Sequence, residues 1–560
     1  MALMSLFGGL NAFADVVNQD GVVYDIMPDG KCFVVGYDEA KMPEGGIVTI
    51  AATVKINGTD CRVTGILGSE NYTTTDNNYN NNDKTGDNRA AFFNCEKITC
   101  LKFADKSGVT LIGDHAFKNC SNLKTIENIP STLTDIQKWC FEHTALESVN
   151  LSNTQLQWLR TGCFYDCGNL KEVKLPSTLT TPNSGNWVEA DDDKYGKQAF
   201  QKTAIESIDL TNTQLISLGD YMFADCSLKT VKLPSTLKYI WHHAFCNSSL
   251  SSITLPNFLQ KIDAYAFQYA KLANVVIPTS CSIVDQAAFA NNDNLTTVVI
   301  NGTKCYLAYE AFWHCPKLTD VYITSNSQPT AERYGFPFDN NPKVHVMKDY
   351  VDVFSGLRTN ENLNPCNTTN FDSNFSHTLS KEWTTFTSAY NLDFSSAEGL
   401  TAYTATYNDK KDAVALTPVK RVAAHTGLIL KGEAGKTYTL TILASNEPEL
   451  EGGTDNQLIG CVDAIWSTGR ETDYYLHDGK FVKSTYDGWV LPGKSYLYID
   501  GGRPNNSPLR VYVDNTATSI DGITNNHVVK DEAYYNLQGV KVQHPQHGVF
   551  IHNGKKVVLK

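Results

Sequence analysis

The chain lacks long apolar runs and the sequence patterns of the common hydrolases and nucleotide-binding enzymes. After its first residues, no stretch approaches the 18 consecutive apolar residues of a membrane-spanning helix. No HExxH, GxSxG, P-loop or EF-hand pattern occurs, and Asp191–Asp193 lacks the spacing and glycine of a calcium loop. We therefore expect no enzyme and no membrane-spanning helix, and we predict no catalytic residues, no cofactor and no metal site.

Basic charge is also scarce. Lys and Arg number 47 against 60 Asp and Glu, which gives a net charge of -13. The basic residues are scattered, so nucleic acid is not an expected partner. By contrast, 42% hydrophobic and 11% aromatic residues in a chain of 560 are enough to build several domain cores.

The N-terminus reads "MALMSLFGGLNAFADVV", a short apolar run that ends in Ala12-Phe13-Ala14. This small-x-small pattern suits a signal peptidase, so we interpret residues 1–14 as a signal peptide remnant and expect a secreted or outer-surface location. The basic residues that usually begin such a peptide are missing. A truncated gene start would explain this, and a buried strand is the alternative.

A hydrophobic repeat dominates the middle of the chain. A core Phe recurs at steps of 25, 24, 23, 36, 23, 22, 22, 22 and 23 residues. The ten members are Phe92, Phe117, Phe141, Phe164, Phe200, Phe223, Phe245, Phe267, Phe289 and Phe312. A polar insertion, "TPNSGNWVEADDDKYG", accounts for the long step, and a surface loop tolerates such an insertion.

Eight of the ten repeats also have an apolar residue five positions before the Phe, and an alternating segment such as "EVKLP" or "SITLP" follows the Phe. Alternation with β-branched residues predicts a strand. About seven apolar side chains contribute roughly 10–20 kcal/mol when buried, whereas ordering some 22 residues costs roughly 20–40 kcal/mol. Single repeats therefore cannot fold alone, and we predict a solenoid in which strands pair in parallel and the Phe rings form a column.

These repeats, as in "LKEVKLPSTLT" and "LKYIWHHAFCNSSL", resemble the BspA-type leucine-rich repeats of surface proteins from Bacteroidetes, treponemes and some protozoa. The resemblance implies a non-enzymatic adhesin or host-protein binder. A later stretch, "TGLILKG" to "LPGKSYLYI", is similar to a sandwich module that follows such repeats, and the C-terminus resembles a secretion sorting tail.

We predict a mainly β chain in seven segments. A β-rich cap over 15–66, with Asp-Gly and Asn-Gly turns, follows the signal peptide remnant, and an Asn-rich loop insertion covers 67–90. The repeats with their C-terminal cap cover 91–350, and a connector covers 351–375. An antiparallel β-sandwich-like domain covers 376–513, and a linker with a short β tail covers 514–560. Three short strands are expected in the tail, the last two joined at Asn553-Gly554.

The chain has 15 cysteines. Cys120, Cys167, Cys226 and Cys315 each fall three residues after a core Phe. Recurrence at one position indicates a repeated buried environment for a small apolar side chain, so we favour free thiols over disulfides. The pair Cys95 and Cys120, on successive repeats, is the exception to check. His544, His547 and His552 in the tail lack supporting ligands, and we interpret them as turn residues rather than a metal site.

Alternation in the strands also predicts which side chains face outward. The outward row is Asn150, Lys174, Asp209, Lys232, Thr254, Val276, Val299 and Tyr322, which turns from charged to apolar. We hypothesise a ligand-contact patch of Val276, Val299 and Tyr322, flanked by Thr254 and Lys232. The alternative is that the C-terminal cap or the sandwich covers the patch.

Our first functional hypothesis is an exported, adhesin-like surface protein whose solenoid binds protein ligands, such as host extracellular matrix or other microbial surface proteins. The alternative is a glycan-binding accessory protein of a polysaccharide-using surface system, in which the sandwich holds a polysaccharide through Trp383, Trp466 or Trp489.

Overall fold

The computed structural model describes most of the chain, and the structural statements below refer to this part. The described ranges are 16–27, 30–69, 90–181, 195–302, 305–308, 310–323, 338, 342–351, 371–452, 455–485, 487–503, 506–513, 534–535, 541–542, 548–552 and 555–559. The proposed signal peptide remnant and most of both the polar insertion and the Asn-rich insertion lie outside them. The chain forms two compact units, Met1–Tyr512 and Val513–Lys560.

The fold is almost entirely β, as predicted. The described residues contain hardly any helical structure apart from a 3-10 turn at Lys348–Tyr350, where the repeat region ends. No helix in this part of the chain is both long and apolar enough to cross a membrane.

The N-terminal strands form a cap that supplies the first strand of both solenoid sheets. One sheet continues from the cap into the first rungs. Its strand order is β1 (Val17–Gln19), β2 (Val22–Ile26), β3 (Cys32–Tyr37), β6 (Thr59–Ile66), β8 (Leu111–Ile112) and β10 (Asp135–Ile136). β4 (Ile47–Ile50) pairs in parallel with β7 (Cys100–Phe103), which pairs with β9 (Thr125–Glu127). β5 (Thr53–Ile56) pairs with β6 across Asn57-Gly58, whose positive φ values of 51° and 79° suit the predicted turn. The terminal rung is thus hydrogen-bonded to a folded cap.

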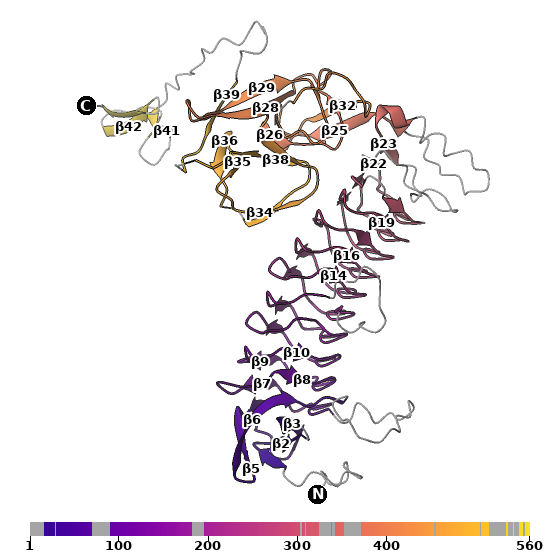
Figure 1. Ribbon diagram of the computed structural model, residues 1–560, viewed down its shortest axis with the longest axis vertical. Coiled ribbons are helices and arrows are strands. Elements are labelled where there is room, and N and C mark those ends of the chain that lie inside the picture. The colour runs from indigo at the N-terminus through magenta and orange to yellow at the C-terminus, as the bar shows by residue number, and fades with distance from the viewer. Residues whose placement is uncertain are drawn as a thin grey trace, which may run out of the picture. The chain divides into compact units, whose positions relative to one another are not determined.

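Most rungs contribute a strand to one of several parallel sheets and a short strand at the apolar position five before the Phe (Figure 1). The turn that follows the short strand carries the core Phe. The longer strands are β11 (Ser148–Asn150), β12 (Glu172–Lys174), β13 (Ser207–Asp209), β15 (Thr230–Lys232), β18 (Asn274–Ile277), β20 (Thr297–Ile300), β22 (Asp320–Ile323), β23 (Lys343–His345) and β24 (Phe371–Asp372). The short strands are β14 (Ser217–Leu218), β16 (Tyr239–Ile240), β17 (Lys261–Ile262), β19 (Ile283–Val284) and β21 (Tyr306–Leu307).

The predicted Phe column is present. All ten core Phe rings are fully buried, and successive rings stack with centroids 5.0–5.7 Å apart and nearly parallel planes. Tyr37 of the cap extends the column at one end, at 5.8 Å from Phe92, and Phe338 extends it at the other, at 5.2 Å from Phe312. The repeat is therefore held together by a continuous aromatic spine.

In nine of the ten turns around a core Phe, the residues two before and two after the ring are both left-handed, and around Phe92 only Asn94 is. Asn, Asp and His recur there, for example Asn119, His143 and Asp225, because these residues tolerate positive φ better than most others. We did not predict this feature, although the recurring polar residues around the Phe were a signal for it.

One predicted strand is missing. The segment "SITLP" at residues 252–256 forms no ladder with its neighbours, and only Pro256 makes an isolated parallel bridge, to Ala464. Leu255 is nevertheless buried, so the rung keeps its place in the core.

Antiparallel strands follow the solenoid, as the predicted sandwich requires. One sheet has the order β25-β32-β27-β30, a second β26-β31-β28-β29-β39, and a third β33-β38-β35-β36, with a separate pair β34-β37. The strands are β25 (Asn374–Thr378), β26 (Trp383–Phe386), β27 (Leu392–Asp393), β28 (Thr401–Asn408), β29 (Ala413–Val419), β30 (Arg421–Val422), β31 (Leu428–Lys431), β32 (Thr437–Ile442), β33 (Leu458–Cys461), β34 (Ile465–Thr468), β35 (Asp473–His477), β36 (Lys480–Lys483), β37 (Asp487–Val490), β38 (Lys494–Tyr498) and β39 (Arg510–Val513). We call residues 371–512 the C-terminal module.

The tail unit contains four described strands, where we expected three. β40 (Tyr534–Tyr535), β41 (Lys541–Val542), β42 (Gly548–His552) and β43 (Lys555–Leu559) form an antiparallel sheet in the order β41-β40-β42-β43. β42 and β43 form the expected hairpin, in which His552 pairs with Lys555. Asn553, Gly554, His544 and His547 lie outside the described residues.

Candidate functional site

Neighbouring residues of the outward row are in register within each set of paired longer strands. Asn150 lies beside Lys174, Asp209 beside Lys232, and Val276 beside Val299. Inward neighbours such as Val149, Val173 and Ile208 are buried. The predicted alternation is therefore confirmed for these strands, and Thr254 lies in the rung that forms no strand.

The N-terminal part of the row is exposed and charged. Asn150, Lys174, Asp209 and Lys232 are all exposed. Lys232 binds Asp209 at 2.9 Å, and on the first rungs of the repeat region Lys102 lies 3.4 Å from Glu127. We call the six residues Lys102, Glu127, Asn150, Lys174, Asp209 and Lys232 the polar row.

The charges of the polar row are held in place by local hydrogen bonds. Partial burial opposes ionisation of Asp209, but hydrogen bonds from Thr211 and Lys232 prevail and lower its pKa. A few residues away, the Lys229 ammonium lowers the pKa of Glu206. Both carboxylates therefore stay ionised at neutral pH.

The C-terminal end of the row differs from our expectation. Tyr322 was predicted to face a ligand, but its side chain is only 6% exposed. Its ring stacks on His345 at 4.3 Å and meets the ring of Phe375 edge-on at 5.3 Å. Val299 packs against the same hydrophobic cluster, and Val276 is half-buried. The prediction that Tyr322 is exposed was wrong, because the C-terminal module covers it.

Polar contacts fasten the C-terminal module to four successive rungs, just beyond their strand positions. The Asp463 carboxylate accepts hydrogen bonds from the Thr279 amide at 3.1 Å, the Thr279 hydroxyl at 2.5 Å and Asn301 Nδ2 at 3.0 Å. The Trp489 indole donates to the Leu233 carbonyl at 3.0 Å. With the Pro256 bridge to Ala464, these contacts form a seam at intervals of one repeat.

The three Trp residues proposed for glycan binding do not form one site. Trp489 is 9% exposed and its indole nitrogen is used in the seam, while Trp466 packs edge-on against it at 5.2 Å. Trp383 is half-buried on another strand, under the Lys431 ammonium at 4.9 Å and next to Tyr403.

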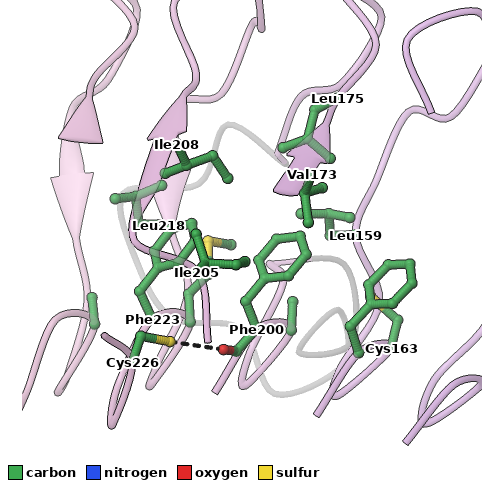
Figure 2. Close-up of a cluster of buried hydrophobic side chains, with 14 of the residues drawn as sticks. Leu159, Cys163, Val173, Leu175, Phe200, Ile205, Ile208, Leu218, Phe223 and Cys226 are labelled. Atoms are coloured by element: carbon green, nitrogen blue, oxygen red, sulfur yellow. Dashed lines mark hydrogen bonds between the residues drawn. The ribbon is translucent and has the colours of Figure 1, made fainter. Parts of the chain in front are cut away.

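All 14 cysteines of the described part have free thiols, as predicted, and Cys95 and Cys120 are among them. The four thiols that recur three residues after a core Phe, Cys120, Cys167, Cys226 and Cys315, are more than space-filling groups, because each donates a hydrogen bond to a core Phe carbonyl of the preceding rung. Cys120 bonds Phe92 at 3.1 Å, and Cys226 bonds Phe200 at 2.9 Å (Figure 2). Burial raises the pKa of Cys226 to about 11, so the thiol stays protonated and unreactive.

Other rungs carry a different donor at the same position. Asn292 Nδ2 donates to the Phe267 carbonyl of the preceding rung at 2.9 Å. The Thr203 hydroxyl donates to the Phe200 carbonyl of its own rung, also at 2.9 Å. The alternation of Cys, Thr and Asn three residues after the Phe was the sequence signal for a buried donor. We missed it by reading only the cysteines.

In the part of the chain that the structure describes, no group of three or more His, Cys, Asp or Glu side chains could hold a metal ion.

The fold and the repeat define a leucine-rich repeat solenoid. Residues 88–187 and 193–319 match the BspA type leucine rich repeat region, in six copies. The repeat region of this chain is therefore similar to BspA-type leucine-rich repeats. Among curated proteins, none matches the chain significantly.

Several solved bacterial structures are similar to this chain. A leucine-rich repeat protein from Bacteroides ovatus has 20% identity, with 59% of this chain and 76% of that chain covered and a TM-score of 0.38. The pneumococcal vaccine antigen PcpA has 15% identity, coverage of 64% and 98%, and a TM-score of 0.33. A leucine rich cell surface protein from Faecalibacterium prausnitzii has 17% identity, coverage of 55% and 88%, and a TM-score of 0.28.

Proposed function

We propose that this chain is an exported, non-enzymatic binding protein of the cell surface or the secreted fraction, and that its solenoid binds a protein ligand in an adhesin-like role. Host extracellular matrix and the surface proteins of other microbes are the expected ligands. The observation that carries the proposal is the polar row, which is in register, outward-facing and backed by a continuous buried core.

The polar row suits a protein ligand because its charges are paired only at the surface. Exposed ion pairs such as Lys232 with Asp209 contribute about 0–1 kcal/mol each, so a ligand can replace them at low cost. Charges of both signs on a rigid sheet favour specific recognition and fast association. The apolar end of the row is not needed for this function, since Tyr322 stabilises the joint with the C-terminal module.

A binding screen with charge-reversal variants tests this function. The full chain is screened against matrix proteins and microbial surface proteins, and a hit is measured again with Lys174→Glu plus Lys232→Glu. We expect slower association and a weaker dependence on salt, because steering charges act mainly on the association rate. The control is Lys55→Glu plus Lys271→Glu, which makes the same charge change at exposed residues outside the polar row.

An equal loss in both variants would indicate a general charge effect and would contradict the proposal. Unchanged binding in the Lys174 and Lys232 variant would contradict it as well. Binding of glycans in place of proteins by the unmodified chain would instead favour the accessory-protein alternative.

A further inference from the structure

A stack of three aromatic rings lies on the turns of three successive rungs. Tyr221, His243 and Tyr265 each occupy the left-handed position two residues before a core Phe, with φ of 55°, 55° and 59°. His243 stacks on Tyr221 at 4.6 Å and 6°, and on Tyr265 at 4.8 Å and 18°. The imidazole is therefore held in one orientation from both sides.

A second imidazole meets this stack from the side. The ring of His242 is inclined by 73° to that of His243 and lies edge-on to Tyr221 and Tyr265, at 5.6 Å from each. The Nδ1 atoms of His242 and His243 are 2.8 Å apart. Two nitrogens of two oriented, half-buried rings thus converge at one point.

We propose that His242 and His243 form a two-nitrogen chelate for a divalent transition-metal ion of the Ni²⁺, Cu²⁺ and Zn²⁺ group. Two imidazole nitrogens at about 2.0–2.1 Å from one ion and at right angles to each other lie about 2.9 Å apart. The observed 2.8 Å separation matches this spacing. Imidazole is a preferred ligand of these ions.

The protonation states suit metal binding. Burial lowers the pKa of His242, and burial together with His242 lowers the pKa of His243 to about 4. Both rings are thus neutral at pH 7. In the neutral pair one Nδ1 donates its proton to the other, so binding requires that this proton move to Nε2 of the same ring, with no net release.

Nearby charges are mixed but mainly acidic. Asp225 faces His243, whereas Asp263, Asp285 and Lys197 face His242. Lys261 bridges Asp263 and Asp285 at 3.3 and 3.4 Å, so these carboxylates add charge without being free ligands. A site with two protein donors leaves the remaining coordination positions to water or to a donor on a partner.

Calorimetric titration of the full chain with Ni²⁺ tests the proposal. His242→Asn is the main variant, because it removes one nitrogen while the Tyr221–His243–Tyr265 stack is kept. We expect it to lose one equivalent of bound Ni²⁺ relative to the unmodified chain, and His243→Asn to lose the same equivalent. The matched control is His143→Asn, which alters an exposed histidine paired with Asp166 and should keep the full stoichiometry.

The number of Ni²⁺ ions bound per chain distinguishes this site from the other histidines. Any binding to those histidines, including the ones in the tail, would be equal in all variants. Circular dichroism verifies that each variant is folded. Full stoichiometry and unchanged affinity in folded His242→Asn would overturn the proposal, as would the absence of any saturable Ni²⁺ or Zn²⁺ binding by the unmodified chain.

Discussion

Removal of one ring from the Phe column should destabilise the solenoid strongly. Phe200 is fully buried and stacks on Phe164 at 5.7 Å and on Phe223 at 5.5 Å. Phe200→Ala leaves a cavity that neighbouring rungs cannot close, because both adjacent rings are fixed by their own stacks. Phe→Ala in a core costs about 3–5 kcal/mol, and the loss of two stacked pairs places this variant at the upper end, since each pair contributes about 0.5–1.5 kcal/mol.

Urea unfolding followed by circular dichroism measures this effect. Phe258→Ala is the matched control, since the same atoms are removed from a side chain that is 60% exposed, and its effect should stay within about 0.5 kcal/mol. Phe200→Ala should move the first unfolding transition to lower urea concentration, because each rung is stable only on its neighbours. Equal midpoints for the two variants would refute the view that the column holds the rungs together.

Three further predictions concern single buried groups. Cys226→Thr should be nearly neutral in urea unfolding, whereas Cys226→Val should cost about 0.5–1.5 kcal/mol, because Val removes one of the two donors to the Phe200 carbonyl and leaves only the Thr203 hydroxyl. Asp463→Ala should speed hydrogen exchange at the Thr279 amide, whose acceptor it removes, and unchanged exchange would contradict the seam. Burial, with a smaller effect of Lys494, lowers the pKa of His377 to about 4. The unfolded chain therefore binds a proton first as the pH falls, and stability should decline between about pH 6.5 and pH 4, by up to about 3 kcal/mol. His377→Gln should flatten this decline in thermal unfolding.

The features that repeat could be predicted from the sequence. The position of each core Phe, the inward Val and Ile of the strands and the free thiols all depend on the adjacent rung, which carries the same pattern. One rung therefore predicts the surroundings of the next. Even here the chemistry was incomplete, because Cys226 was interpreted as a small apolar group and not as a donor to Phe200.

The features that do not repeat could not be predicted in this way. The cover over Tyr322 comes from Phe375, and the seam on Thr279 comes from Asp463, residues far along the chain that follow no period. The pairing of His242 with His243 depends on the left-handed turn, which the hydrophobic pattern does not show.

The position of the seam explains the change in character along the outward row. The row is charged up to Lys232 and becomes apolar at Val276, Val299 and Tyr322, and the seam contacts begin at Leu233. Outward apolar residues in a solenoid therefore indicate burial by a following module as readily as they indicate a ligand site. The polar row remains largely exposed, and association of a ligand with it would depend on salt because its charges would steer the encounter.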